Sequence, residues 1–298
     1  MSLPWLAYTL PGVLADDSIR IAEPNGDCSA LFFTVDTSLP MSGSHTLLDH
    51  LLLIALLAWT VADWLWIYPR FVRSIAAGTP GARKRLYVSI VALEWALTLG
   101  IVVLWSAKGR DFGSLFMELG IPWRLALGMA LAAALIGLLV LQRRAVLARP
   151  QLMDIVRRKI AHAEPLVPHT RSERRMFVIV SLTAGACEEI LFRGFVTWYF
   201  WIWVGPVAAV LLSALLFGFG HIYQGIAQVP KTGLVGLSLA IVVLLTGSLW
   251  ASMIMHAAID VNSGDLGFRV FGEPGTTTVG AGTDQTLGGS DAGKATEA

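Results

Sequence analysis

The feature that most constrains this chain is a succession of long apolar segments separated by short polar connections. Hydrophobic residues make up 55% of the 298 residues and charged residues only 14%, whereas an average soluble domain has about 25% charged residues. An apolar stretch of about 20 residues is long enough to cross a bilayer as a helix. The sequence therefore predicts an all-α, polytopic integral membrane bundle.

About seven transmembrane helices are predicted, and they divide the chain into five regions. The apolar segments lie at about residues 50–68, 86–105, 122–141, 176–195, 206–221, 233–245 and 248–261. The predicted regions are a non-membrane segment (1–45), the first three transmembrane helices (46–145), a basic connection (146–174), helices with intramembrane polar groups (175–265) and a disordered tail (272–298).

Two basic connections predict the orientation of the chain in the membrane. Lys and Arg are concentrated at 70–85 and 142–175, and such loops face the cytoplasm. Two spans separate them, so the two assignments agree. We therefore expect the N-terminus outside and the tail in the cytoplasm, in a protein of the bacterial inner membrane. Residues 151–163 are predicted to form an amphipathic helix on the membrane surface.

Three ionisable residues interrupt the fourth apolar segment. Glu188, Glu189 and Arg193 lie within the run Ala184–Gly194, and ionisable groups at membrane depth are costly and commonly functional. Glu189 and Arg193 are four residues apart and are predicted to form an ion pair on one helix face. Glu188 is turned about 100° away, so it faces other helices and is a candidate general base.

Two more polar pairs follow downstream, Phe217-Gly-Phe-Gly-His221 and His256-Ala-Ala-Ile-Asp260. In each pair the outer residues share a helix face. Glu188, His221, His256 and Asp260 come from three apolar segments, which can bring them together only inside a helical bundle.

Each polar residue taken alone also has a structural interpretation. A single intramembrane His can hydrogen bond across helices, and two adjacent glutamates can belong to a salt-bridge network. Their joint occurrence favours a functional site. Glu94 and Asp63 are each isolated in the sequence, and we interpret them as helix-end or packing residues. Gly218 and Gly220 permit the close approach of a neighbouring helix or a substrate backbone.

Three motifs in order resemble those of the CPBP family, the CAAX-protease and bacteriocin-processing intramembrane endopeptidases, also called the Abi family. They are Glu188-Glu189-x-x-x-Arg193, Phe217-x-x-x-His221 and His256-x-x-x-Asp260. The resemblance covers about residues 175–265, roughly a third of the chain. It implies an intramembrane endopeptidase that hydrolyses a peptide bond of a membrane-associated or lipidated protein.

The resemblance also implies a role for each motif residue. Glu188 would activate the attacking water, and His221 would orient or deprotonate it. His256 and Asp260 would stabilise the oxyanion of the tetrahedral intermediate. Glu189 and Arg193, with Phe217, would be structural or orienting.

One motif position departs from the family pattern. The best-understood members have Asn where this chain has Asp260, and an ionised Asp cannot donate a hydrogen bond to an oxyanion. Asp260 is therefore either protonated or paired with His256, which it would keep cationic.

No cofactor is predicted, although one alternative remains open. The chain has no His-Glu-x-x-His motif, but Glu188, His221 and His256 could form a three-ligand zinc site. The expected partners are membrane lipid and the protein substrate. The net charge of +1 suggests no nucleic-acid partner.

Two other functional classes remain as alternatives. One is a catalytically silent immunity or scaffold protein of the same family, which would bind a partner in the bilayer. The other is a proton-coupled transporter, in which Glu and His relay protons. Transporters often contain inverted repeats, and we detect no internal repeat in this sequence.

Overall fold

A computed structural model describes residues 44–272, and the regular structure in this range is helical without strands. The all-α prediction is therefore confirmed for this range. The α-helices are α1 (Leu47–Ala62), α2 (Tyr68–Ala76), α3 (Ala82–Ala107), α4 (Pro122–Leu147), α5 (Pro150–Ile160), α6 (Arg171–Glu188), α7 (Thr197–Gly220), α8 (Val229–Thr246) and α9 (Trp250–Phe271). The predicted N-terminal segment and tail lie outside the described residues, apart from residues 44, 45 and 272.

Five helical stretches in the described range are long and apolar enough to cross a membrane. They are Leu47–Ala76, Ala82–Ala107, Pro122–Leu147, Arg171–Gly220 and Ile226–Thr246. The fourth stretch is 50 residues long because it contains two arms, which reverse direction at Gly205. Helix α9, which carries Asp260, Asp265 and Arg269, is not among the five. The reversal and α9 account for the difference from the predicted seven, and the helical membrane bundle is confirmed.

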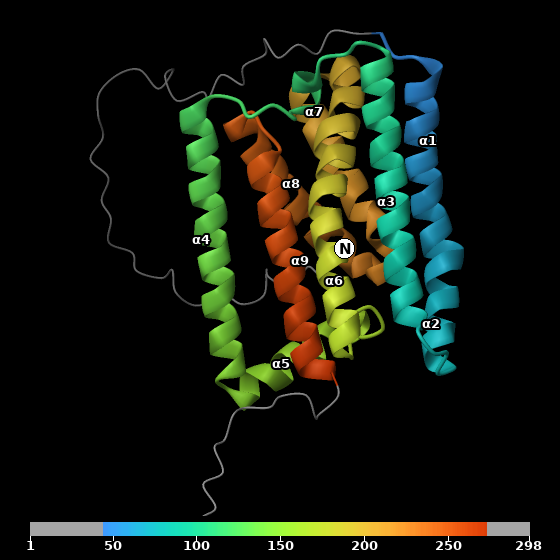
Figure 1. The fold of residues 1–298 in the computed structure, drawn as a ribbon, viewed down its shortest axis with the longest axis vertical. Coiled ribbons are helices and arrows are strands. Elements are labelled where there is room, and N and C mark those ends of the chain that lie inside the picture. The colour runs from blue at the N-terminus through green and yellow to red at the C-terminus, as the bar shows by residue number, and fades with distance from the viewer. Residues whose placement is uncertain (1–43, 273–298) are drawn as a thin grey trace, which may run out of the picture.

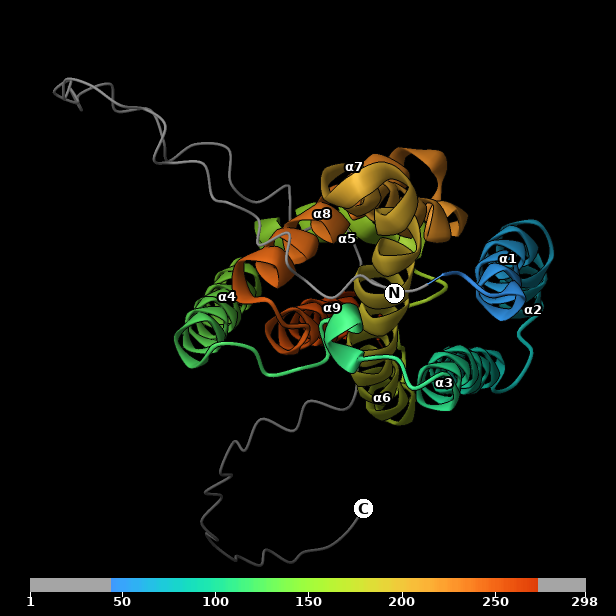
Figure 2. The ribbon, with the colours of Figure 1, turned by 90° about the horizontal axis from the view of Figure 1, so that it is seen from above.

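The bundle is arranged around α6 (Figures 1 and 2). This helix packs against α9 and α3, while α7 packs against α8 and α4 against α9. Seen from above, α4 and the α1–α2 pair lie on opposite outer sides of the molecule. The helix with the two adjacent glutamates is thus among the most enclosed parts of the structure.

The outer faces of the helices carry large apolar side chains. Leu99 and Val103 on α3, Leu141 on α4, Leu182 on α6 and Val207 on α7 are all more than half exposed. Few soluble proteins expose apolar side chains on so many elements. In a bilayer these faces contact lipid, so their exposure has no cost.

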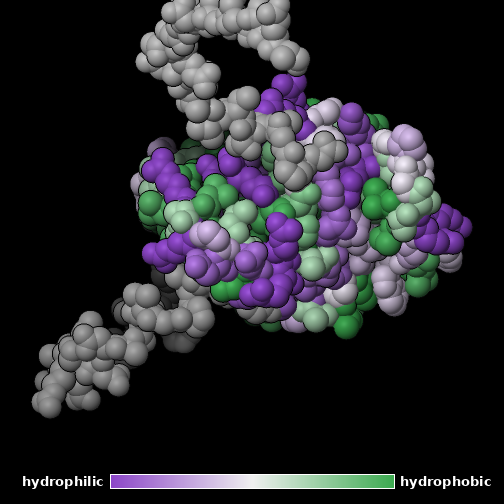
Figure 3. Space-filling model, turned by 90° about the horizontal axis from the view of Figure 1, so that it is seen from below, coloured by the Kyte–Doolittle hydropathy of each residue, from purple (hydrophilic) through white to green (hydrophobic). Residues whose placement is uncertain are grey.

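Basic residues gather at the end of the bundle where α5 lies, at the bottom of Figure 1, and we call this the basic end. The connections 77–81 and 148–170 both lie there, and Figure 3 shows the many hydrophilic residues on this face. α5 runs across the end with Val156 and Ile160 buried and Arg157, Arg158 and Lys159 exposed. The amphipathic helix predicted over 151–163 is therefore confirmed over Pro150–Ile160, followed by a 3₁₀ turn at Ala161–Ala163, and its position on the membrane surface stays a prediction.

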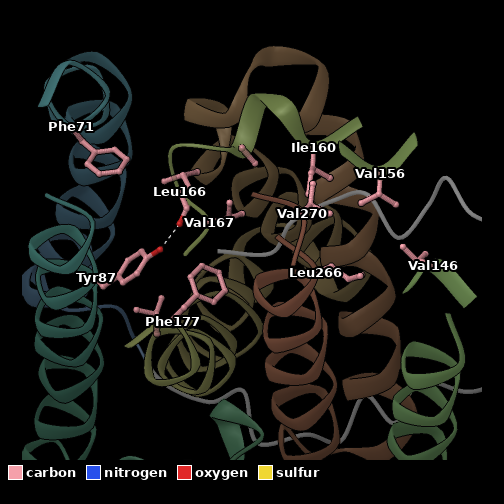
Figure 4. Close-up of a cluster of buried hydrophobic side chains, with 12 residues drawn as sticks. Phe71, Tyr87, Val146, Val156, Ile160, Leu166, Val167, Phe177, Leu266 and Val270 are labelled. Carbon is pink, nitrogen blue, oxygen red and sulfur yellow. Dashed lines mark hydrogen bonds between the residues drawn. The ribbon is translucent and has the colours of Figure 1, made fainter. Parts of the chain in front are cut away.

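A cluster of buried apolar side chains closes the basic end (Figure 4). It includes Phe71, Tyr87, Val167, Phe177 and Leu266, from segments far apart in the sequence. The Tyr87 hydroxyl donates a 2.6 Å hydrogen bond to the Leu166 carbonyl oxygen, which fixes the loop before α6 against α3. The loop therefore holds α3 and α6 together at this end.

The arms of the long stretch bring Glu188 and His221 to the same depth. Glu188 lies 17 residues before Gly205 and His221 16 residues after it, which is about 25 Å of helix in each case at 1.5 Å per residue. Gly205 has a φ of 75°, which favours glycine. The returning arm, which ends at Gly220, is shorter than the arm that begins at Arg171, so it ends level with Glu188.

The first membrane helix is longer than predicted. It is continuous from Leu47 to Ala76, although the apolar segment was expected to end near residue 68. Residues Asp63–Ile67 form a π-helical turn just before Pro69. A wider turn here accommodates a proline, which lacks an N–H and would otherwise break the helix.

The crossing of α6 and α9 depends on Gly185, and this gives a first prediction. A Cβ atom at Gly185 would lie 2.7 Å from the Ala257 Cβ atom and 2.8 Å from the Met253 carbonyl oxygen. We expect Gly185→Leu to push the helices apart and to lower the melting temperature of the detergent-purified protein by about 5 °C or more.

The matched control is Gly137→Leu on α4, where a Cβ atom meets nothing within 4 Å. It should melt like the wild type in the same fluorescence-detected size-exclusion assay. Equal melting temperatures for the two variants would show that the α6–α9 crossing does not need a glycine.

Candidate active site

The two adjacent glutamates lie where the geometry of the central helix changes. Glu188 is the last residue of α6, and Glu189–Val196 is π-helical. Such π-helical turns occur frequently at functional sites. The side chains of both glutamates are buried, with Glu189 fully inaccessible. The turn re-aims the side chains of this segment toward α8 and α9.

Arg193 compensates the charge of Glu189. The Arg193 Nη1 atom lies 2.8 Å from Glu189 Oε1, and both side chains are almost fully buried. The predicted ion pair is therefore confirmed. Arg193 also donates a 3.1 Å hydrogen bond from Nη2 to the Gly236 carbonyl oxygen. Its guanidinium lies 4.1 Å from the centre of the Phe217 ring, so Phe217 forms one wall of the ion pair.

Glu189 also orients His256. The His256 Nδ1 atom lies 2.8 Å from Glu189 Oε1, and a carboxylate can only accept a hydrogen bond. The proton is therefore on Nδ1, and Nε2 points away from Glu189. That Nε2 atom lies 3.7 Å from Glu188 Oε2 and 3.8 Å from Asp260 Oδ2.

His221 approaches Glu188 from the end of α7. Its Nδ1 atom lies 2.9 Å from the Phe217 carbonyl oxygen, which again places the proton on Nδ1. Its Nε2 atom lies 3.9 Å from Glu188 Oε2. Both imidazoles thus present Nε2 to the same carboxylate oxygen, and neither ring is separated from Glu188 by more than 3.9 Å.

The structure brings the sequence-predicted polar residues into one group. Glu188, His221, His256 and Asp260 meet in the interior, and all four are buried. Glu189, Arg193 and Phe217 surround them and make the contacts described above. The convergence expected from three separate apolar segments is therefore observed.

The zinc alternative receives no support from the arrangement. Within residues 44–272, no group of three or more His, Cys, Asp or Glu side chains is placed so that it could hold a metal ion. Glu188, His221 and His256 do not form such a site.

A cavity of about 100 Å³ opens onto Glu188 and His221. Its walls come from α1, the π-helical turn after it, α3 and α6, and are mostly apolar. The lining includes Leu56, Trp59, Ile90, Leu93, Leu97, Leu191, Phe192 and Tyr223. The space can hold several water molecules beside the Glu188 carboxylate.

Two acidic residues that the sequence showed as isolated lie on the cavity wall. Glu94 and Asp63 both line the cavity, and Glu94 lies close enough to Glu188 for a side-chain hydrogen bond. The interpretation of Glu94 as an isolated packing residue is therefore wrong. A single acid within an otherwise uncharged span already indicates a functional position. The sequence alone, however, could not show that Glu188 on another helix is its neighbour.

Glycines allow the site helices to approach one another. A Cβ atom at Gly218 would lie 2.6 Å from the Val229 carbonyl oxygen on α8, so the expected close helix approach is confirmed there. Gly220 instead lines the cavity. Gly236, which the sequence did not single out, leaves room for Phe217 and Arg193, whose nearest atoms are 2.8 and 3.1 Å from a built Cβ.

The buried ion pair gives a second prediction. Arg193→Met leaves the Glu189 charge uncompensated, and we expect it to destabilise the protein by about 3–5 kcal/mol, because breaking one side of a buried pair exposes the full cost of the remaining charge. Loss of monodisperse protein on heating, measured in detergent, would report this.

The double variant Glu189→Gln/Arg193→Met removes both charges and provides the control. It should recover most of the lost stability, although not the orientation of His256. If the double variant is as unstable as Arg193→Met, packing rather than charge compensation explains the effect of Arg193.

Comparison with known proteins agrees with this geometry. Residues 171–262 match the model of the type II CAAX prenyl endopeptidase Rce1-like family. No curated protein and no solved structure gives a match. The matched region begins at the first residue of α6 and ends within α9, so it contains every motif residue described above. Over residues 171–262, the resemblance to the CPBP peptidases that the motifs indicated is therefore confirmed, in its Rce1-like branch.

Proposed function

We propose that this protein is an intramembrane endopeptidase of the glutamate type, which hydrolyses a peptide bond with a water molecule activated by Glu188 and His221. The observation that carries the proposal is the placement of Glu188 Oε2 3.9 and 3.7 Å from the Nε2 atoms of His221 and His256, beside a cavity. Acid–base chemistry needs titratable groups around one reacting atom.

In the first step, a water molecule beside Glu188 attacks the carbonyl carbon of the substrate. One O–H bond of the water breaks as the new C–O bond forms, and the proton passes to Glu188 or to the lone pair on Nε2 of His221. The protonated Nδ1 of His221 is held by the Phe217 carbonyl oxygen, which leaves Nε2 as the basic atom.

In the second step, the tetrahedral intermediate collapses and the C–N bond breaks. The proton taken from water passes to the leaving nitrogen, so the products are a carboxyl group and an amine. The negative oxygen of the intermediate needs hydrogen-bond donors. We assign this role to His256 and Asp260. His256 donates from Nε2 as an imidazolium, while its Nδ1 donates to Glu189, and Asp260 donates as a neutral carboxyl group.

The cavity supports a substrate that is apolar near the cleaved bond. Its walls carry leucine, isoleucine, tryptophan and phenylalanine side chains, which suit a lipidated tail or a membrane-embedded segment. The basic end would face the cytoplasm. The substrate class is then a membrane-associated or lipidated protein, as the type II CAAX prenyl endopeptidase match suggests.

The proposal predicts that cleavage depends on Glu188 and His221 individually. We expect Glu188→Gln and His221→Ala each to lower kcat by about 10²–10⁴, the usual contribution of a general acid–base group. The assay would use purified protein with quenched peptides, some of them prenylated.

The matched control is His162→Ala, which removes an exposed histidine near α5 and should leave kcat unchanged. A chelator should also leave it unchanged. Wild-type activity in Glu188→Gln would refute the mechanism. Loss of activity with the chelator would instead support a metal-dependent mechanism with Glu188, His221 and His256 as ligands.

The oxyanion role of Asp260 gives a separate prediction. Asp260→Asn places a permanent hydrogen-bond donor at this position, so kcat should stay within a few-fold of wild type. Asp260→Leu removes the donor and should lower kcat by about 10²–10³. If Asp260→Asn is as inactive as Asp260→Leu, the carboxyl group acts through its charge on His256 instead.

A further inference from the structure

Glu94 is a buried acid in the middle of α3, outside the region that matches the peptidase family. It is the only charged residue between positions 86 and 107, and it is 9% exposed. A charge at membrane depth is costly, so a lone acid in such a helix requires an explanation.

The position of Glu94 is fixed by the packing of α3 on α6. The adjacent Trp95 donates a 3.3 Å hydrogen bond from Nε1 to the Thr183 hydroxyl on α6, and Tyr87 anchors the helix two turns earlier. In this register, Glu94 and Glu188 line the same cavity. Their carboxyl groups are close enough for a hydrogen bond between the side chains.

Two neighbouring carboxyl groups in an apolar site cannot both be ionised without a large repulsion. Among residues 44–272, no basic side chain forms an ion pair with Glu94, and its Oε2 atom has no hydrogen-bond partner. Glu188 Oε2, by contrast, lies 3.7 Å from Nε2 of His256, which carries a positive charge when both of its ring nitrogens are protonated. The charge of the pair is therefore better accommodated on Glu188, which leaves Glu94 as the neutral acid.

We propose that Glu94 is a positioning residue that donates a hydrogen bond from its neutral carboxyl group to the Glu188 carboxylate. This bond holds Glu188 ionised and fixes its rotation, so that Oε2 faces His221 and His256. The proposal rests on the proposed function of Glu188 as the water-activating carboxylate. It adds a residue of α3 to a site otherwise built from α6, α7 and α9.

The test compares two substitutions of Glu94 in the full-length protein. Glu94→Leu removes the donor, and kcat should fall about 10- to 100-fold, the factor expected for a lost hydrogen bond to a charged group. KM and the melting temperature should stay near wild type, because an apolar side chain suits this depth. Glu94→Gln retains an N–H donor and should restore kcat to within a few-fold.

Two controls separate failure of this proposal from failure of the proposed function. Glu118→Leu replaces an exposed acid and should be fully active, while Glu188→Gln should be inactive. If Glu188→Gln is inactive and Glu94→Leu has wild-type kcat, Glu94 does not position Glu188. The donor role is also refuted if Glu94→Gln is as slow as Glu94→Leu. An active Glu188→Gln overturns the proposed function itself.

Infrared spectroscopy tests the same bond without any substrate. The wild type at neutral pH should show the carbonyl stretch of a protonated carboxyl group. Glu94→Gln should lose this band, and Glu188→Gln should shift its frequency because the acceptor changes from a carboxylate to an amide. A spectrum that is the same in the wild type and in Glu94→Gln would show that Glu94 is not the neutral acid.

Discussion

The buried ion pair between Glu189 and Arg193 is the interaction on which the rest of the site depends. At membrane depth an uncompensated charge is very costly, so Arg193 makes it possible for Glu189 to be a carboxylate. Glu189 in turn holds Nδ1 of His256 at 2.8 Å and thereby turns Nε2 toward Glu188. A pair that contributes little net stability by itself thus sets the orientation of the His256 imidazole.

The fold supplies depth and enclosure for this chemistry. The central helix continues well beyond Glu188 before the chain reverses at Gly205, so the returning arm brings His221 level with Glu188. Gly185 lets α6 approach the backbone of α9, Gly218 lets α7 approach the backbone of α8, and Gly236 leaves room for the side chains of Phe217 and Arg193. The cavity beside Glu188 lies between α3 and the first membrane helix.

The cavity is lined by residues from both halves of the chain. The region that matches the peptidase family contains the motif residues, whereas much of the apolar wall comes from α1 and α3. With Glu94 as a positioning residue of Glu188, α3 contributes to the proposed chemistry, and α1 and α3 together contribute to the apolar wall that would contact the substrate. This division explains why motifs within a third of the chain do not describe the whole site.

The sequence by itself determined the class of fold, the ion pair and the set of polar groups. These depend on local properties of the sequence: the length of each apolar segment, the i, i+4 spacing of Glu189 and Arg193, and the rarity of charge at membrane depth. Only the tertiary structure decided which segments meet. His221 meets Glu188 because of the lengths of the two helical arms and the reversal between them. Glu94 meets Glu188 because of the register of α3 against α6. These are relations between segments far apart in the chain, and no local pattern encodes them.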